Sequence, residues 1–107
     1  MDVNEEAPPL TLLVEIDPPS LLVRLCGEID LSCVDLLDSI DGLNLNGVRD
    51  VTLDLELLEF ADAAGATALL RLRANQLAAG RDVRMTAPRR IVRKVFDILG
   101  EGHVLAA

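Results

Sequence analysis

The sequence predicts a single-domain α/β fold, with a mixed sheet of about four strands and helices packed mainly on one side. Short runs of Leu, Val and Ile alternate with segments of helical periodicity, in the order β-β-α-β-α-β-α. Strands separated by helices favour parallel pairing, whereas the two consecutive strands at the start favour an antiparallel hairpin. The 107 residues fit one domain, and half of them are hydrophobic, which is enough for a packed core.

Four segments have the composition of strands. Residues 10–16 end at the turn signal 17–20, and residues 21–26 follow at once, which predicts the hairpin. Residues 51–55 form a short, apolar, β-branched run typical of a buried central strand. Residues 83–86 form the last predicted strand.

The first predicted helix spans residues 32–41 and is expected to begin at Ser32 as its N-cap. Its inward positions repeat at helical spacing: Cys33, Leu36, Leu37 and Ile40. The segment should end near Gly42, where glycine and asparagine residues indicate a loop.

Two further helices are predicted. Residues 63–79 follow Asp62, a suitable N-cap, and end at Gly80; Gln76 should face water, and the apolar stripe should consist of Ala66, Leu69, Leu70 and Leu77. Residues 89–99 follow Pro88, and Ile91, Val95 and Leu99 should pack inward. Together with the central strand, these helices predict four side chains that are inaccessible to solvent: Leu53, Leu55, Leu69 and Leu70.

The N-terminal residues differ in composition from the rest. Residues 1–9 carry three acidic residues and no basic one, so they predict a flexible acidic tail and not a signal peptide, with the domain at 10–107. No apolar run approaches the roughly 20 residues that span a bilayer, so no stable membrane insertion and a cytoplasmic location are expected.

Several classes of function have little support in the sequence. Phe60 and Phe96 are the only aromatic residues, too few to stack the bases of a nucleic acid. Cys26 and Cys33 lack a set of further ligands, so buried thiols are expected and a metal or other cofactor is not. No nucleophile and base are spaced as in a known catalytic set, and His103 is the only histidine. The chain is therefore predicted not to be an enzyme.

Charge is unevenly distributed along the chain. The first 62 residues hold 15 acidic and 2 basic side chains, whereas residues 63–107 hold 3 acidic and 8 basic ones. The acidic part suits a protein partner with a basic docking surface, and the alternative is a solvated surface that aids solubility. The net charge of −8 disfavours binding to nucleic acid.

Three motifs in order resemble the STAS domain family, which includes the bacterial anti-sigma factor antagonists. They are Gly27-Glu28-Ile29-Asp30, Val51-Thr52-Leu53-Asp54-Leu55 and Phe60-Ala61-Asp62-Ala63-Ala64-Gly65, and the similarity extends over about residues 10–105. The resemblance implies a STAS-like sheet covered on one side. It also implies partner switching, in which the antagonist binds an anti-sigma factor that is a Ser/Thr kinase, until phosphorylation of its own serine releases it.

The sequence departs from that family at the decisive turn. Where the family has two serines before the glycine, this chain has Ala63 and Ala64, and Ala64 stands at the position of the usual phospho-acceptor. Alanine has no oxygen to phosphorylate, so the usual switch is absent there. Thr67 and Ser32 are alternative acceptors, although helix-surface and capping roles explain them, and Thr52 is expected to be buried with a bonded hydroxyl.

The resemblance implies a partner-binding surface formed by Asp30, Asp62, Ala63, Ala64, Gly65 and Thr67. For the two aspartates, helix capping or turn chemistry alone is the competing interpretation. The alternative function is that of a structural STAS subunit in a stressosome-like or lipid-transport ATPase complex. A nucleotide or lipid bound beside the Asp62 turn is a third possibility, and the oligomeric state is left open between monomer and dimer.

Overall fold

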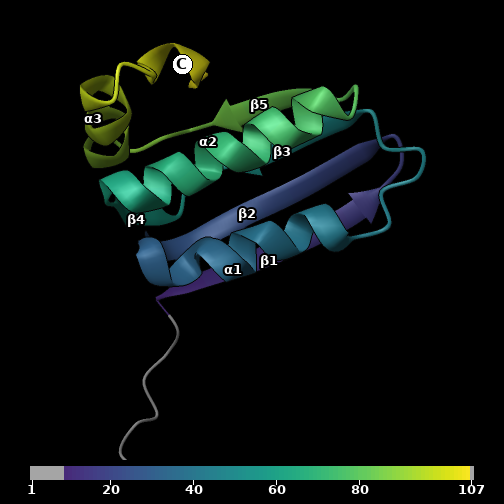
Figure 1. Ribbon diagram of the computed structural model, residues 1–107, viewed down its shortest axis with the longest axis horizontal. Coiled ribbons are helices and arrows are strands. Elements are labelled where there is room, and N and C mark those ends of the chain that lie inside the picture. The colour runs from purple at the N-terminus through teal and green to yellow at the C-terminus, as the bar shows by residue number, and fades with distance from the viewer. Residues whose placement is uncertain (1–8, 107) are drawn as a thin grey trace, which may run out of the picture.

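A five-stranded mixed sheet forms the centre of the computed structural model, which describes residues 9–106 (Figure 1). The strands are β1 (Leu10–Asp17), β2 (Ser20–Ile29), β3 (Asp50–Asp54), β4 (Leu58–Ala61) and β5 (Asp82–Thr86). β1 and β2 form the predicted antiparallel hairpin, and β3 and β5 continue the sheet in parallel in the order β1-β2-β3-β5. The predicted tail lies outside the described residues except for Pro9, whose carbonyl oxygen accepts the Glu28 N–H at 2.7 Å.

β4 is a strand that the sequence interpretation missed. Its four residues pair in parallel with the end of β2, after a shift of register between Gly27 and Glu28. The segment is too short to show an alternation of apolar and polar residues, and it runs directly into an alanine-rich helix. The mixed sheet therefore has five strands where about four were predicted.

The sheet is covered by helices on one face, as predicted. α1 (Val34–Asp38) and α2 (Ala63–Ala78) lie side by side across it, and α3 (Arg90–Ile98) packs beside β4 at one end (Figure 1). The side chains beneath the helices are buried: Leu21, Val23, Leu25, Val51, Leu53 and Met85. The alternate side chains are partly or fully exposed on the other, open face: Leu22, Arg24, Thr52, Asp54 and Arg84. Thr52 is thus half-buried, and the prediction that it is buried was wrong.

The first helix differs most from its prediction. The predicted helix 32–41 is a 3₁₀ turn (Leu31–Cys33), the short α1 and a second 3₁₀ turn (Ser39–Gly42). Cys33, Leu37 and Ile40 are buried as predicted, but Leu36 is exposed, because a segment of such short pieces presents a narrower inward stripe than a continuous helix. Cys26, expected to be buried, is half-buried on the open face of β2.

In α2 and α3 the inward faces are rotated from those predicted. Leu69 is fully buried as predicted, but Leu70 is only partly buried and Leu77 is 39% exposed. Leu72 and Gln76 are the buried residues in that part of α2. In α3, Val92 and Phe96 fill the core, Val95 and Leu99 pack partly against it, and Ile91 is 48% exposed.

Gln76 is buried because it belongs to a polar network and not to the solvated face. Its side-chain nitrogen donates to Asp41 at 2.9 Å, and its oxygen accepts from Arg81 at 3.1 Å. Arg81 also donates to the carbonyl oxygens of Leu45 and Val48. The network satisfies each buried polar atom, and it ties the loop before β3 to the end of α2.

We expect Leu53→Ala to reduce the free energy of unfolding by about 2–5 kcal/mol, because the side chain is fully buried and its loss leaves a cavity. Leu57→Ala is the matched control: Leu57 is 47% exposed, so its truncation should cost less than about 1 kcal/mol. Chemical denaturation measures both variants. Equal losses for the two would contradict the central position of β3.

Candidate functional site

The sequence-predicted site lies at one end of the sheet, where β2 and β4 finish side by side. Ile29 pairs with Ala61 across these strands, and the Asp62 N–H donates to the Ile29 carbonyl oxygen at 3.1 Å. Asp30 and Asp62 follow directly after these two strands. The start of α2, β4 and α3 gather at the same end of the molecule (Figure 1).

Asp30 caps the 3₁₀ turn that follows β2. Its carboxylate accepts a hydrogen bond from the Ser32 hydroxyl at 2.6 Å and another from the Ser32 N–H at 2.9 Å. These two bonds, the hydroxyl first, lower the pKa of Asp30 below its ordinary value, because both stabilise the ionised form. The cap is therefore Asp30, and the prediction that Ser32 caps the helix was wrong.

Asp62 caps α2, as predicted. Its carboxylate accepts the Gly65 N–H at 2.7 Å, and its backbone oxygen accepts the Ala66 N–H at 2.9 Å. An ionised carboxylate is favourable at this position, since the N-terminus of a helix carries a partial positive charge.

Gly65 is buried between the first turn of α2 and the end of β2. A Cβ atom at this position would overlap the Ile29 carbonyl oxygen and lie 3.0 Å from the Asp30 nitrogen. The absence of a side chain is therefore what allows α2 to begin directly against β2. Gly65 lies beneath the predicted surface and brings its parts together.

The remaining predicted residues reach the solvent at the end of β2 and in the first turns of α2. Ala63 and Thr67 are exposed, and Ala64, Asp30 and Asp62 are half-buried. The Thr67 hydroxyl donates to the Ala63 carbonyl oxygen at 2.8 Å, one turn back along the helix. We call Asp30, Asp62, Ala63, Ala64 and Thr67 the Asp62 surface.

Two large exposed apolar side chains lie close in sequence to Asp30 and Asp62, and they were not predicted as site residues. Leu31, next to Asp30, is 71% exposed, and Phe60, at the end of β4, is 40% exposed. Exposed apolar and aromatic side chains with polar residues around them are common at protein-binding sites.

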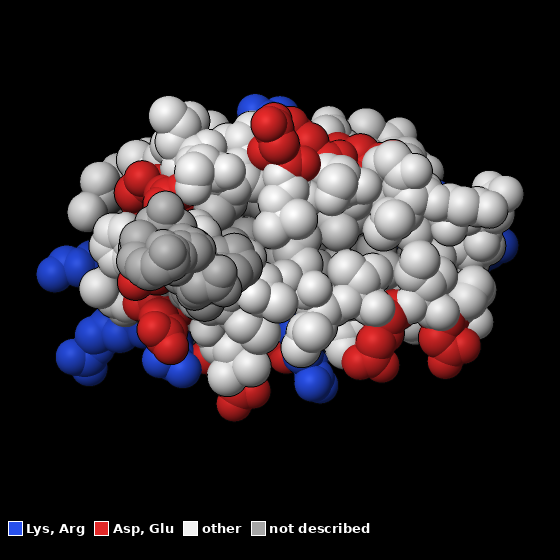
Figure 2. Space-filling view, turned by 90° about the horizontal axis from the view of Figure 1, so that it is seen from below, with Lys and Arg blue, Asp and Glu red and all other residues white. Residues whose placement is uncertain are grey.

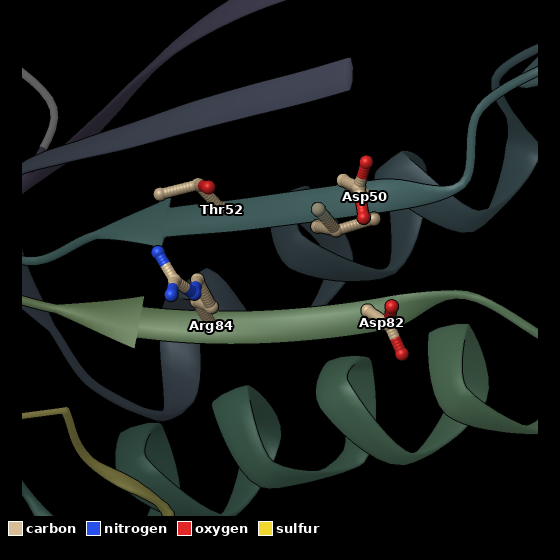
Figure 3. Close-up of a pocket in the computed structure, with 5 residues that line it drawn as sticks. Asp50, Thr52, Asp82 and Arg84 are labelled. Atoms are coloured by element: carbon tan, nitrogen blue, oxygen red, sulfur yellow. The ribbon is translucent and has the colours of Figure 1, made fainter. Parts of the chain in front are cut away.

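A hollow of about 430 Å³ lies away from the Asp62 surface. It is lined by Asp50, Val51, Thr52, Asp82 and Arg84, on the open face of β3 and β5 (Figure 3). Asp50 and Asp82 are paired at the starts of these parallel strands, whereas Asp30 and Asp62 follow strand ends. This hollow is therefore not the groove beside Asp62 that the sequence interpretation considered for a nucleotide or lipid.

The described residues offer little that would hold a metal ion or insert into a membrane. Within 9–106, no three His, Cys, Asp or Glu side chains are grouped as metal ligands. No helix in the same range has the length and hydropathy to cross a bilayer.

Comparison with known proteins gives a consistent family and fold. The family model described as "Mlab, STAS domain" matches residues 12–106. No curated protein matches the chain. Among solved structures, unphosphorylated SpoIIAA, an anti-sigma factor antagonist, has a TM-score of 0.75 at 24% identity, over 90% of this chain and 86% of that one. An anti-sigma factor antagonist from Mycobacterium paratuberculosis has a TM-score of 0.74 at 23% identity, over 92% and 86%.

We expect Ser32→Ala to raise the pKa of Asp30 towards its ordinary value, because the substitution removes the hydroxyl that stabilises the carboxylate most. NMR titration of the Asp30 side-chain carboxyl carbon measures the change. Ser39→Ala is the control: its hydroxyl donates to the Leu36 carbonyl and not to Asp30, so the pKa of Asp30 should stay the same. An unchanged Asp30 pKa in Ser32→Ala would contradict the capping geometry.

We expect Gly65→Ala to destabilise the fold by about 1–3 kcal/mol, because its Cβ overlaps backbone that cannot move without displacing α2 or β2. Gly42→Ala is the matched control, since nothing lies within 4 Å of a Cβ there and its φ is not positive. Thermal unfolding compares the two variants. If Gly65→Ala were as stable as Gly42→Ala, the close approach of α2 to β2 would be wrong.

Proposed function

The chain belongs to the STAS domain family, and we propose that it is a non-catalytic, cytoplasmic protein-binding domain that acts in the manner of the anti-sigma factor antagonists it resembles. The observation that carries the proposal is the Asp62 surface. It combines two capping carboxylates with two alanines at the start of α2, and the exposed Leu31 and Phe60 lie close to it in the sequence. Such a surface suits a regulatory protein with a basic docking site, for which an anti-sigma factor of the Ser/Thr kinase type is the first candidate.

The second part of the proposal is that the partner is bound constitutively. Ala64, the second residue of α2, stands at the position of the phospho-acceptor serine in the family it resembles. A phosphate would add about −1.5 to −2 charges beside Asp62 and Asp30, and would disrupt an interface by repulsion and desolvation. Without that hydroxyl, the usual signal for release is missing.

The two alternative hydroxyls are already engaged. Ser32 donates to the Asp30 carboxylate, and Thr67 donates to the Ala63 carbonyl oxygen. A phosphate on Ser32 would replace a hydrogen-bond donor with an anion next to a carboxylate, which is electrostatically unfavourable. These bonds favour the hypothesis that the phosphorylation switch is absent over the hypothesis that it has moved to Ser32 or Thr67.

A structural STAS subunit of a stressosome-like or lipid-transport ATPase complex is the second candidate. It is kept because the matching family model is described as "Mlab, STAS domain" and does not name an anti-sigma factor antagonist. The two candidates differ in what the chain binds: one soluble kinase-type regulator, or a large assembly. Affinity capture with the full chain, followed by mass spectrometry, distinguishes them.

We expect Ala64→Asp to weaken binding of the captured partner at least about tenfold, because it places a negative charge on the proposed interface. An acidic residue in the first turn is favourable for a helix, so a loss of binding would not reflect loss of folding. Ala74→Asp, on an exposed position in the middle of α2, is the control and should bind normally. Calorimetry with the captured partner gives the affinities.

The same partner tests the loss of the switch. After incubation with the partner and ATP, wild-type protein should keep its intact mass, whereas Ala64→Ser should gain one phosphate if the partner is a kinase. A phosphate on wild-type protein, mapped to Thr67 or Ser32, would show that the switch has moved. Unchanged affinity in Ala64→Asp would reject the Asp62 surface as the interface and favour the structural-subunit alternative.

A further inference from the structure

The two edges of the sheet differ in how they are protected. At the β5 edge, Leu105 forms a bridge with Met85, the Ala106 N–H donates to the Met85 carbonyl oxygen, and Asp82 and Arg84 place charges along the strand. Within residues 9–106 no strand pairs with the outer edge of β1, which is eight residues long. Exposed edges of this length usually carry charges or are covered, since their free backbone groups pair readily with another strand.

The backbone of β1 is suitable for such pairing. Pro9 accepts a hydrogen bond from Glu28 of β2, so the odd-numbered residues of β1 direct their backbone groups towards β2. Because the direction alternates in an antiparallel strand, the N–H and C=O groups of the even-numbered residues point outward. These residues are Leu10, Leu12, Val14 and Ile16.

The side chains along this edge are apolar and exposed. Leu13 is 49%, Ile16 45% and Val14 38% exposed. The stretch from Pro9 to Val14 carries no charge, and Glu15 is the first ionisable residue of β1. β1 is the lowest strand in Figure 1, and the view from that side in Figure 2 shows a mostly uncharged central band, with both acidic and basic groups around its margins.

We propose that a second copy of this chain pairs with β1, antiparallel and around a two-fold axis at Leu13, so that two sheets join into one of ten strands. Charge favours this occupant over a basic segment of another protein. The stretch from Pro9 to Val14 offers no carboxylate to a cation, and the two carboxylates of β1, Glu15 and Asp17, lie at its C-terminal end. A two-fold axis requires a surface that complements itself, and an uncharged strand meets that requirement.

The register follows from the same residues. With the axis at Leu13, each Thr11 lies opposite Glu15 of the other copy, Leu12 lies opposite Val14, and Leu10 lies opposite Ile16. A hydroxyl then meets each carboxylate, and apolar side chains meet apolar ones. An axis at Val14 would place Leu13 against Glu15, and an axis at Glu15 would bring two carboxylates face to face. The dimer does not use β4 or α2, so both copies of the Asp62 surface stay accessible.

Sedimentation equilibrium of the full chain tests the dimer. The wild-type protein should be a reversible dimer at concentrations below about 1 mM. Its association should strengthen with added NaCl, because salt screens the repulsion between two chains of net charge −8. Leu13→Arg places two cations face to face and should weaken association at least about tenfold. A wild-type protein that stays monomeric, or a dimer that Leu13→Arg leaves intact, overturns the proposal.

Two further variants test the register. Thr11→Lys creates two ion pairs with Glu15 across the axis and should tighten association about three- to tenfold at low salt, with the gain lost at high salt. Ala74→Lys adds the same charge on an exposed position of α2 and should tighten it less than about twofold, through the smaller net charge alone. In a Cys26→Ser background, Leu13→Cys should form a disulfide between copies under mild oxidation, whereas Leu12→Cys alone should not.

Circular dichroism confirms that each variant is folded before it is compared. Crosslinking through Leu12→Cys and not through Leu13→Cys would reject the register, as would equal effects of Thr11→Lys and Ala74→Lys. Because the Asp62 surface takes no part in the dimer, Ala64→Asp should dimerise like the wild type. Failure of this proposal therefore leaves the proposed function standing, and the reverse also holds.

Discussion

The arrangement of the molecule depends on the close approach of the first turn of α2 to the end of β2. Gly65 makes that approach possible, since any Cβ there would overlap the Ile29 carbonyl oxygen. With α2 starting at this point, its inward residues Leu69 and Leu72 lie over the sheet and bury one face of it. The same contact places the caps of two helices next to each other, because Asp62 donates its N–H to Ile29 while Asp30 follows Ile29 in the chain. The core and the candidate site thus share one geometric condition.

The order of the elements and the one-sided sheet could be predicted because they depend on local patterns of apolar residues and on turn residues. Which residues of a helix face the core depends also on how the chain enters that helix. In α3, Ile91 and Val92 both begin an apolar repeat, and the structure buries Val92 and Phe96 while Ile91 is exposed. From the helical repeat alone, Gln76 is expected to face water. Its amide is instead hydrogen-bonded by Asp41, which is distant in the sequence, and by Arg81, which follows the helix. Such partners cannot be seen in a local pattern.

The candidate site shows the same division. Asp62 could be predicted as a cap, because capping needs only the residue and the helix that follows. The cap at Asp30 was assigned to Ser32 instead, since both residues are good caps and the short 3₁₀ turn begins one residue earlier than the helical repeat indicates. That Asp30 and Asp62 are neighbours came from the family resemblance and depends on the pairing of β4 with β2, a strand too short to recognise. Exposure of Leu31 and Phe60 is a property of the folded surface and has no signature in the sequence.

The electrostatics of the Asp62 turn favours an uncharged residue at position 64. The N-terminus of α2 offers a partial positive charge, and Asp62 already uses it through the Gly65 N–H, while Asp30 holds a second carboxylate in its ionised form nearby. A dianion added to this turn would compete with Asp62 for the same helix dipole and would face Asp30 as well. Each of these interactions favours the unphosphorylated form. A phosphate on a serine at this position would therefore be electrostatically unfavourable, which would make it an effective signal for release. With alanine at position 64 no phosphate can be added there, and the caps at Asp30 and Asp62 do not depend on that side chain. The proposed absence of a phospho-acceptor is thus compatible with a surface that binds its partner constitutively, as proposed above.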